Sequence, residues 1–374
     1  ERFQIGAFDM EILYPDYDNC IANLACSMMK HFGVEPPNPT LPLVDGLLDK
    51  RYKNVVVLLL DGMGNNIIEA NLAPDGFFRS HLAGTYSSVF PPTTVAATTA
   101  MDSGLFPVQS AWLGWTGYFP EIDRNVVYYL NQDFDTNEQI EGDSVAWTYV
   151  PYWSIHDRIR DAGYRSHYLA PFANPYPKDF GALCGEIKRL CAEDGEKYIH
   201  AYWDQPDTVM HRKGCFGELA KSAVRELERA IEELADELSD TLLLVTADHG
   251  HIDSPKAVVT DYPDIMECLV RMPSIEPRCL NLFVKDGMDE QLKAAFAKHF
   301  DGKFLLMSKA EVKERQLFGK GTPHPHFDGM LGDYIAVAVD AVSIYNMNCK
   351  NFVGAHAGLT KDEMIIPLIA VKKD

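Results

Sequence analysis

The sequence lacks several patterns that would assign it to common classes of protein. It has 34 basic against 54 acidic side chains, a net charge of −20, and no tract of lysine and arginine. Binding to a nucleic acid backbone requires a clustered positive surface, so we predict that duplex nucleic acid is not a partner. The apolar run at 55–60 is far shorter than the roughly 18 residues that cross a bilayer, so no membrane association is expected.

Cysteine pairs with metal-binding spacing are also missing. The eight cysteines, from Cys20 to Cys349, are scattered, and no two are separated by two residues. This argues against a zinc ribbon or a thioredoxin-type site. Scattered cysteines in a chain of 374 residues are typical of reduced thiols, and no basic segment followed by an apolar one opens the sequence. We therefore predict a cytoplasmic protein.

Internal repeats and low-complexity segments are absent, and patterns typical of strands and helices alternate instead. Strands are expected at 55–60, 165–169, 198–203 and 242–247, and helices at 17–32, from Thr94 onward, and at 152–162, 179–193 and 215–238. The last helix has an apolar stripe that starts with Phe216 and Leu219. The alternation predicts an α/β fold with a mostly parallel central sheet covered by helices on both faces.

The composition changes between residues 253 and 330. Prolines, short strands and one helix near 289–299 replace the regular alternation there. We interpret 253–330 as a small inserted cap subdomain, and residues 1–252 with 331–374 as the core domain, a division consistent with the length. The pattern of the central sheet resumes at 334–339 and closes with 365–371.

Carboxylates and histidines follow the expected strands. Asp61 directly follows the first strand, and Asp248 and His249 follow the fourth. Asp207 and His211 come after the third strand, and their spacing of four residues places both on one face of a helical turn. In a doubly wound sheet, ligands bind at the carboxyl ends of the strands. These side chains are therefore candidates for one shared site.

Two more segments supply a hydroxyl and a further histidine. Residues 90–94 (FPPTT) lead into a helix, whose N-terminus favours the alkoxide of Thr94 and an incoming phosphoryl group. His356 lies between small residues at 354–358. Taken singly, each of these residues also has an ordinary interpretation as a cap, a turn or a surface histidine. Together, nitrogen and oxygen ligands without a thiolate suit two zinc ions or a related divalent pair.

This set of motifs resembles the alkaline phosphatase superfamily, and within it the nucleotide pyrophosphatase/phosphodiesterase branch. The resemblance runs in order from residue 55 to residue 360; the branch has Phe-Pro-x-x-Thr, so Phe90 and Pro91 fix the count at Thr94 rather than Thr93. The run GLFP at 104–107 lies where the branch has GLYP. The resemblance implies an alkaline-phosphatase-like three-layer sandwich. It also implies a two-zinc phosphoric-ester hydrolase that cleaves phosphodiester or pyrophosphate bonds of a small molecule.

The resemblance also implies roles for individual residues. One zinc ion would be held by Asp61, Thr94, Asp248 and His249, and the other by Asp207, His211 and His356. Thr94 would be the nucleophile and would form a phosphothreonine intermediate.

One departure concerns an asparagine that the branch usually carries 21 residues after the nucleophile. Counting from Thr94 reaches Trp115 instead. We predict that the indole N–H of Trp115 takes over as donor to a phosphoryl oxygen, with the Thr116 hydroxyl as a nearby alternative.

Alternative functions remain open at this point. A phosphomonoesterase or a phosphonate hydrolase would use the same site, although the absence of any basic residue between Thr94 and Arg124 favours a diester. The missing asparagine would also suit a catalytically silent metal-binding protein. The sequence leaves homo-oligomerisation open.

Overall fold

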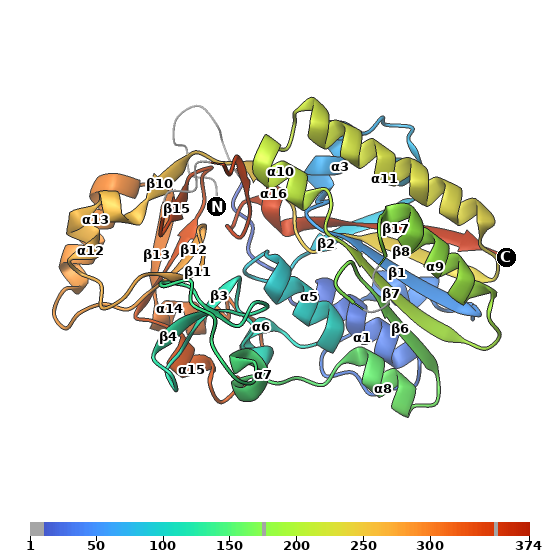
Figure 1. Cartoon of the computed structure of the whole chain (residues 1–374), viewed down its shortest axis with the longest axis horizontal. Helices are drawn as coiled ribbons and strands as arrows, with labels where there is room; N and C mark the ends of the chain where they lie inside the picture. Colours follow the sequence, from blue (N-terminus) through green and yellow to red (C-terminus); the bar gives the residue numbers. More distant parts are fainter. Residues whose placement is uncertain (1–10, 174–176, 348–350) are drawn as a thin grey trace.

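The computed structural model describes residues 11–173, 177–347 and 351–374, and its core is a six-stranded sheet (Figure 1). The strand order is β2-β17-β8-β1-β7-β6, with bounds β1 Asn54–Leu60, β2 Leu82–Ser87, β6 Arg165–Leu169, β7 Lys197–Trp203, β8 Thr241–Thr246 and β17 Ile365–Lys373. Five strands point the same way, and β17 runs antiparallel to both its neighbours. The predicted mostly parallel central sheet is therefore confirmed.

Helices cover both faces of this sheet, which explains why its central strands are apolar throughout. Every residue of β1 and β8 is buried. Figure 1 shows one layer that contains α3 Asn65–Asn71, α9 Phe180–Ala192 and α11 Glu218–Glu237, and a second that contains α1 Ile21–His31, α5 Thr94–Ser103 and α8 Ile155–Asp161. The result is a three-layer sandwich.

Helix α11 begins later than the sequence predicts. Its N-cap is Gly217, so Phe216 precedes the helix and is 51% exposed, and Leu219 is 58% exposed. Both were expected on the apolar stripe, which in the structure starts at Ala220. Phe216 precedes the helix and Leu219 is its second residue, so both lie before the buried face of the helix begins.

A second sheet of seven strands forms the other part of the molecule, on the left in Figure 1. Its order is β13-β14-β12-β11-β3-β4-β5, with bounds β3 Thr116–Phe119, β4 Arg124–Val127, β5 Gln132–Asp133, β11 Ser274–Glu276, β12 Cys279–Leu282, β13 Phe304–Ser308 and β14 Tyr334–Ala338. The expectation that 334–339 returns to the central sheet is wrong, because β14 pairs with β12 and β13. This sheet contains strands from within 253–330 and from both sides of that range. The division of the chain into a core and an inserted cap stays a prediction.

The remaining elements are short, apart from one helix. They are α2 Pro42–Leu47, α4 Phe77–Ser80, α6 Pro107–Ser110, α7 Val145–Tyr149, α10 Asp207–Lys213, η1 Val259–Asp261, α12 Pro263–Met266, α13 Asp289–Phe300, α14 Lys309–Glu314, α15 Phe327–Met330 and α16 Lys361–Met364, with strands β9 Ile252–Asp253, β10 Lys256–Val258, β15 Ser343–Tyr345 and β16 Gly354–Ala355. Within the described ranges, no helix combines the length and apolarity needed to cross a membrane. The seven cysteines in these ranges are free and buried, and Cys349 lies outside them.

Candidate metal centre

Three neighbouring strands deliver carboxylates to one edge of the central sheet. Asp61 follows β1, Asp207 opens α10 after β7, and Asp248 follows β8. These strands pair in parallel, so their carboxyl ends meet at the same edge. Asp61 and Asp248 are buried, and the Asp207 side chain is 13% exposed.

The N-terminus of α5 brings a hydroxyl to the same edge. Thr94 is the first residue of the helix, after Thr93 as N-cap. The Thr94 Oγ1 atom lies 3.4 Å from both carboxylate oxygens of Asp61 and 3.3 Å from the Nε2 atom of His249. A hydroxyl placed at a helix N-terminus gains from the partial positive charge there when it ionises.

A short antiparallel pair aligns two histidines. Strands β9 and β16 pair Ala355 with Ile252, so His251 just before β9 lies beside His356 just after β16. The structure thus brings together all seven side chains that the sequence suggested as metal ligands, and it adds His251.

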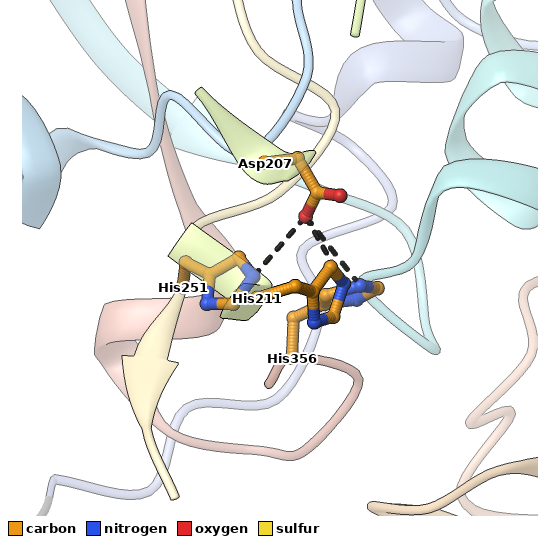
Figure 2. Close-up of side chains that lie close together, drawn as sticks. All are labelled: Asp207, His211, His251 and His356. Atoms are coloured by element: carbon orange, nitrogen blue, oxygen red, sulfur yellow. Dashed lines mark ion pairs between the residues drawn. The ribbon is translucent and has the colours of Figure 1, made fainter. Parts of the chain in front are cut away.

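We call Asp207, His211, His251 and His356 the Asp207 cluster (Figure 2). The Oδ1 atom of Asp207 lies 3.1, 3.4 and 3.8 Å from the Nε2 atoms of His251, His211 and His356, respectively. Ligands at about 2.0 Å from a tetrahedral zinc ion lie about 3.3 Å from each other. The spacing of the cluster fits such an ion.

We call Asp61, Thr94, Asp248 and His249 the Thr94 cluster. The His249 Nε2 atom lies 3.3 Å from Asp61 Oδ1 and 3.5 Å from Asp248 Oδ2, so this cluster has similar spacing. The two clusters adjoin, because ligand atoms of Asp61, Asp207 and His249 lie within 4.8 Å of one another. The rings of His249 and His356 stack at 3.7 Å between centroids.

The orientation of the histidine rings gives an independent test of the fit. The Nδ1 atoms of His211, His249 and His356 lie 2.8–3.1 Å from the carbonyl oxygens of Gly354, Gly250 and Pro92, respectively. A carbonyl accepts only, so each Nδ1 carries a proton, and Nε2 is the nitrogen of each ring that can bind a metal ion. The Nδ1 atom of His251 lies 3.4 Å from the Cys215 sulfur. Metal-binding histidines commonly donate the N–H of their second ring nitrogen to a backbone carbonyl, as His211, His249 and His356 do here.

Buried polar atoms without partners point to the same conclusion. Among the described residues, Asp207 Oδ1, Asp248 Oδ2 and His251 Nε2 are buried and have no hydrogen-bond partner. Asp207 Oδ1 and His251 Nε2 are close enough for a hydrogen bond but not aligned for one, so both are directed at a third point. Since a buried unsatisfied polar atom is costly, these atoms fit a bound cation.

The buried carboxylates and histidines of the centre shift one another's pKa values. Burial, reinforced by the charge of Asp61, raises the pKa of Asp248 well above its usual value. Burial alone would lower the pKa of His249, but the Asp248 and Asp61 carboxylates raise it to about 10. Burial would raise the pKa of Asp207, but the neighbouring histidines lower it below its usual range, and His211 makes the largest of these contributions. Divalent cations would neutralise this concentration of carboxylates.

His251 and Tyr202 are the members of the centre that the sequence reasoning missed. His251 follows His249 by two residues in an extended segment, a spacing that puts both on one face and was available as a signal. Tyr202, the penultimate residue of β7, donates its hydroxyl hydrogen bond to Asp61 Oδ2 and so orients that carboxylate. Nothing in the local sequence marks Tyr202.

A cavity of about 430 Å³ opens onto the centre. Thr94, Asp207, His211 and His356 line part of it, and the predicted donor Trp115 lies on its wall, 41% exposed. A role for the Trp115 indole stays a prediction. The alternative, the Thr116 hydroxyl, accepts a hydrogen bond from the backbone N–H of Ile275 and donates to its carbonyl, so it is occupied in joining β3 to β11.

Glu276 is a further acidic side chain of this cavity. Its Oε1 atom accepts hydrogen bonds from Thr93 Oγ1 at 2.6 Å and from the Trp115 backbone N–H at 2.7 Å. Burial raises the pKa of Glu276, and these two donors act against that rise. The sequence reasoning did not single out this residue.

Comparison with known proteins identifies the family. Residues 55–275, more than half of the chain, match the sequence family described as type I phosphodiesterase / nucleotide pyrophosphatase. The chain belongs to this family. The protein is therefore a hydrolase of phosphoryl compounds, as its motifs predicted. No curated protein gives a significant match to it.

Solved structures share the fold of this chain. Murine ectonucleotide pyrophosphatase/phosphodiesterase 5, as an inactive variant in complex with AMP, is 18% identical, with a TM-score of 0.66 over 86% of this chain and 88% of the other. Phosphonoacetate hydrolase from Sinorhizobium meliloti 1021, in complex with phosphonoacetate, is 14% identical, with a TM-score of 0.61 over 84% and 89%. These similarities confirm the alkaline-phosphatase-like fold.

Proposed function

We propose that this protein hydrolyses a small-molecule phosphodiester or pyrophosphate with two zinc ions and a phosphothreonine intermediate on Thr94. The Asp207 cluster and the Thr94 cluster would each hold one ion. When bound, the ions supply Lewis-acid stabilisation of the charge that develops on phosphoryl and alcohol oxygens. The observation that carries the proposal is the convergence of unpartnered carboxylate oxygens and correctly oriented histidine nitrogens around the Thr94 hydroxyl.

The chain's own residues account for the nucleophile. Thr94 Oγ1 lies at the N-terminus of α5, where the helix dipole favours its ionisation. The same atom lies within 3.4 Å of Asp61 and His249, two of the residues that would hold a cation beside it. Tyr202 holds Asp61, and the Nδ1 contacts hold the histidine rings, which keeps the surroundings of Thr94 preorganised.

A diester is favoured over a dianionic monoester or phosphonate. The described residues that line the cavity include Glu276 and Asp207 but no lysine or arginine. An additional negative charge on the substrate would therefore meet no compensating side chain there. The phosphonoacetate bound by the neighbouring hydrolase carries such an extra charge, which makes phosphonate hydrolysis the weaker candidate for this chain.

The test compares turnover and metal content in wild type and Thr94→Ala. Bis(p-nitrophenyl) phosphate should be cleaved faster than p-nitrophenyl phosphate, and Thr94→Ala should lower turnover by about three orders of magnitude. Removal of metal with a chelator should abolish activity, and zinc should restore it. Elemental analysis should find two metal ions per chain in the active protein.

Thr99→Ala is the matched control, because Thr99 lies on the same helix and its buried hydroxyl has no partner among the described residues. This variant should retain activity. A Thr94→Ala protein that remains as active as wild type would contradict the intermediate. A metal-loaded wild type that is inert toward phosphodiesters and pyrophosphates would favour the silent metal-binding alternative.

A further inference from the structure

The cavity beside the metal centre has a composition that restricts what it can accept. Apart from the residues of the centre itself, its walls are largely apolar, with Trp115, Phe134, Ile275, Leu280 and Phe352 among them. Any organic group attached to a phosphorus atom at the centre would extend into this space. Such a lining favours apolar or aromatic contacts with the substituent.

Glu276 introduces a carboxylate into these walls. The described lining contains no lysine or arginine, and no ion pair of Glu276 with a described residue is found. The Oε1 atom is held by Thr93 and by the backbone of Trp115, whereas Oε2 receives no hydrogen bond from the described residues and is not among their buried unpartnered atoms. Oε2 is therefore accessible from the cavity and free to accept a hydrogen bond from a ligand there.

The position of Glu276 is built into the packing. Gly114 has no side chain, and a Cβ atom there would lie 2.8 Å from the Ile275 side chain and 3.2 Å from Glu276 Cγ. This close approach lets the Trp115 N–H reach Glu276 Oε1. Two donors to one oxygen hold the carboxylate in place, stabilise its ionised form against the effect of burial and leave its second oxygen directed elsewhere.

An ionised carboxylate next to an anionic phosphodiester is unfavourable unless the substrate brings a positive charge. An ammonium group would satisfy Glu276 Oε2 and would also be attracted by the aromatic faces of Trp115 and Phe352. A carboxylate or a second phosphate on the substituent would be repelled. The chemistry of the cavity therefore selects for a cation.

The contact with Thr93 indicates which substituent is involved. Glu276 accepts a hydrogen bond from Thr93, the residue directly before Thr94, so it lies on the side of the nucleophile. In an in-line displacement, the leaving group departs on the side opposite the nucleophile. The group near Glu276 is thus the one that stays on phosphorus.

Building on the proposed function, we propose that Glu276 is a specificity residue that selects phosphodiesters whose retained substituent carries an ammonium group. The substrate class is an aminoalkyl phosphodiester, a zwitterion at neutral pH.

Two synthetic esters with the same leaving group test this proposal. They are p-nitrophenyl 2-aminoethyl phosphate and p-nitrophenyl propyl phosphate, which differ only in an ammonium in place of a methyl group. Wild type should prefer the aminoethyl ester in kcat/KM by about tenfold, chiefly through KM, as expected for a hydrogen bond between charged groups. Glu276→Gln should bring the ratio close to one, and Glu276→Asp, which keeps the charge, should retain part of the preference.

Glu218→Gln is the control for these substitutions, since Glu218 is exposed on α11 and pairs with Lys221. It should keep the wild-type ratio. Equal kcat/KM values for the two esters in wild type would overturn the role of Glu276 and leave the hydrolase intact. A ratio unchanged in Glu276→Gln would overturn it as well.

A binding measurement decides the matter if wild type hydrolyses neither ester, an outcome that would count against the phosphodiester part of the proposed function. Calorimetric titration of metal-loaded Thr94→Ala with 2-aminoethyl phosphate and with propyl phosphate should show tighter binding of the amine. The same preference should disappear in Thr94→Ala/Glu276→Gln. Equal affinities in Thr94→Ala would contradict ammonium selection independently of turnover.

Discussion

At the scale of single residues, the centre depends on what holds the second nitrogen of each histidine. Backbone carbonyls of Pro92, Gly354 and Gly250 fix three of the rings. His251 instead contacts the sulfur of Cys215, a weaker partner, yet it has the shortest distance to Asp207. With three other ligands in the cluster, His251 would complete a four-coordinate site on the protein side.

His251→Ala should therefore weaken metal binding while sparing the fold. Loss of an outer partner of a metal ligand typically lowers metal affinity about 10–100-fold, and loss of a direct ligand should lower it at least as much. Competition with a chromophoric chelator measures the affinity, and elemental analysis shows whether one of two ions is lost. His81→Ala is the control, since the His81 ring bonds the Phe77 carbonyl on α4. Equal affinities in wild type and His251→Ala would exclude His251 as a ligand.

At the scale of elements, one buried ion pair connects the two sheets to the loops that carry the histidines. The Glu363 carboxylate accepts hydrogen bonds from Arg278 Nε at 2.6 Å and Nη2 at 2.8 Å, and from the Gly358 N–H at 2.7 Å. The Glu363 carbonyl accepts from the Gly250 N–H at 2.8 Å. Both side chains are fully buried. Glu363 thus fixes the segments that directly follow His249 and His356.

Glu363→Gln should lower the free energy of unfolding by about 3–5 kcal/mol, because Arg278 would remain as a buried charge without its counterion. Urea denaturation measures the loss. The double variant Arg278→Met/Glu363→Met should recover part of it, since no uncompensated charge remains. A loss below about 1 kcal/mol in Glu363→Gln would show that the pair does not support these loops.

At the same scale, the carboxylates of the metal centre could be predicted from the sequence, whereas the second sheet could not. Asp61, Asp207 and Asp248 were predictable because each follows an apolar strand, and parallel strands end at a common edge. The second sheet was not, since its pairing of Ile275 with Thr116 joins residues far apart in the chain and leaves no local pattern. The cavity and Glu276 depend on that pairing. For the same reason, strand β14 was assigned to the wrong sheet.

At the scale of the whole molecule, a half-buried carboxylate away from the metal centre makes stability depend on pH. Asp102 lies near the end of α5, the helix that begins with Thr94, and its Oδ1 atom is 3.7 Å from His156 Nε2. Burial lowers the pKa of His156 well below its usual value, so this ring stays neutral and offers no countercharge. Burial, with repulsion from Asp157, raises the pKa of Asp102 to about 7, against a hydrogen bond from Tyr152 and attraction by Arg160.

This shift predicts that Asp102→Asn stabilises the protein at high pH. The folded state binds the Asp102 proton more tightly than the unfolded state, whose pKa is 3.8, so ionisation costs stability as pH rises from about 4 to about 7. The asparagine, which cannot ionise, removes this cost. Its advantage in the free energy of unfolding should grow by on the order of 2–3 kcal/mol between pH 5 and pH 8.

Urea denaturation of wild type and Asp102→Asn at both pH values, with the same metal content, measures that difference. Asp236→Asn is the control, because this exposed carboxylate on α11 pairs with Lys373 at the surface and should change stability little. If the stabilities of wild type and Asp102→Asn differ by the same amount at pH 5 and pH 8, Asp102 is ionised with an ordinary pKa in the folded protein. Water in contact with the Asp102 carboxylate, together with attraction by Arg160, would then outweigh the effect of its burial.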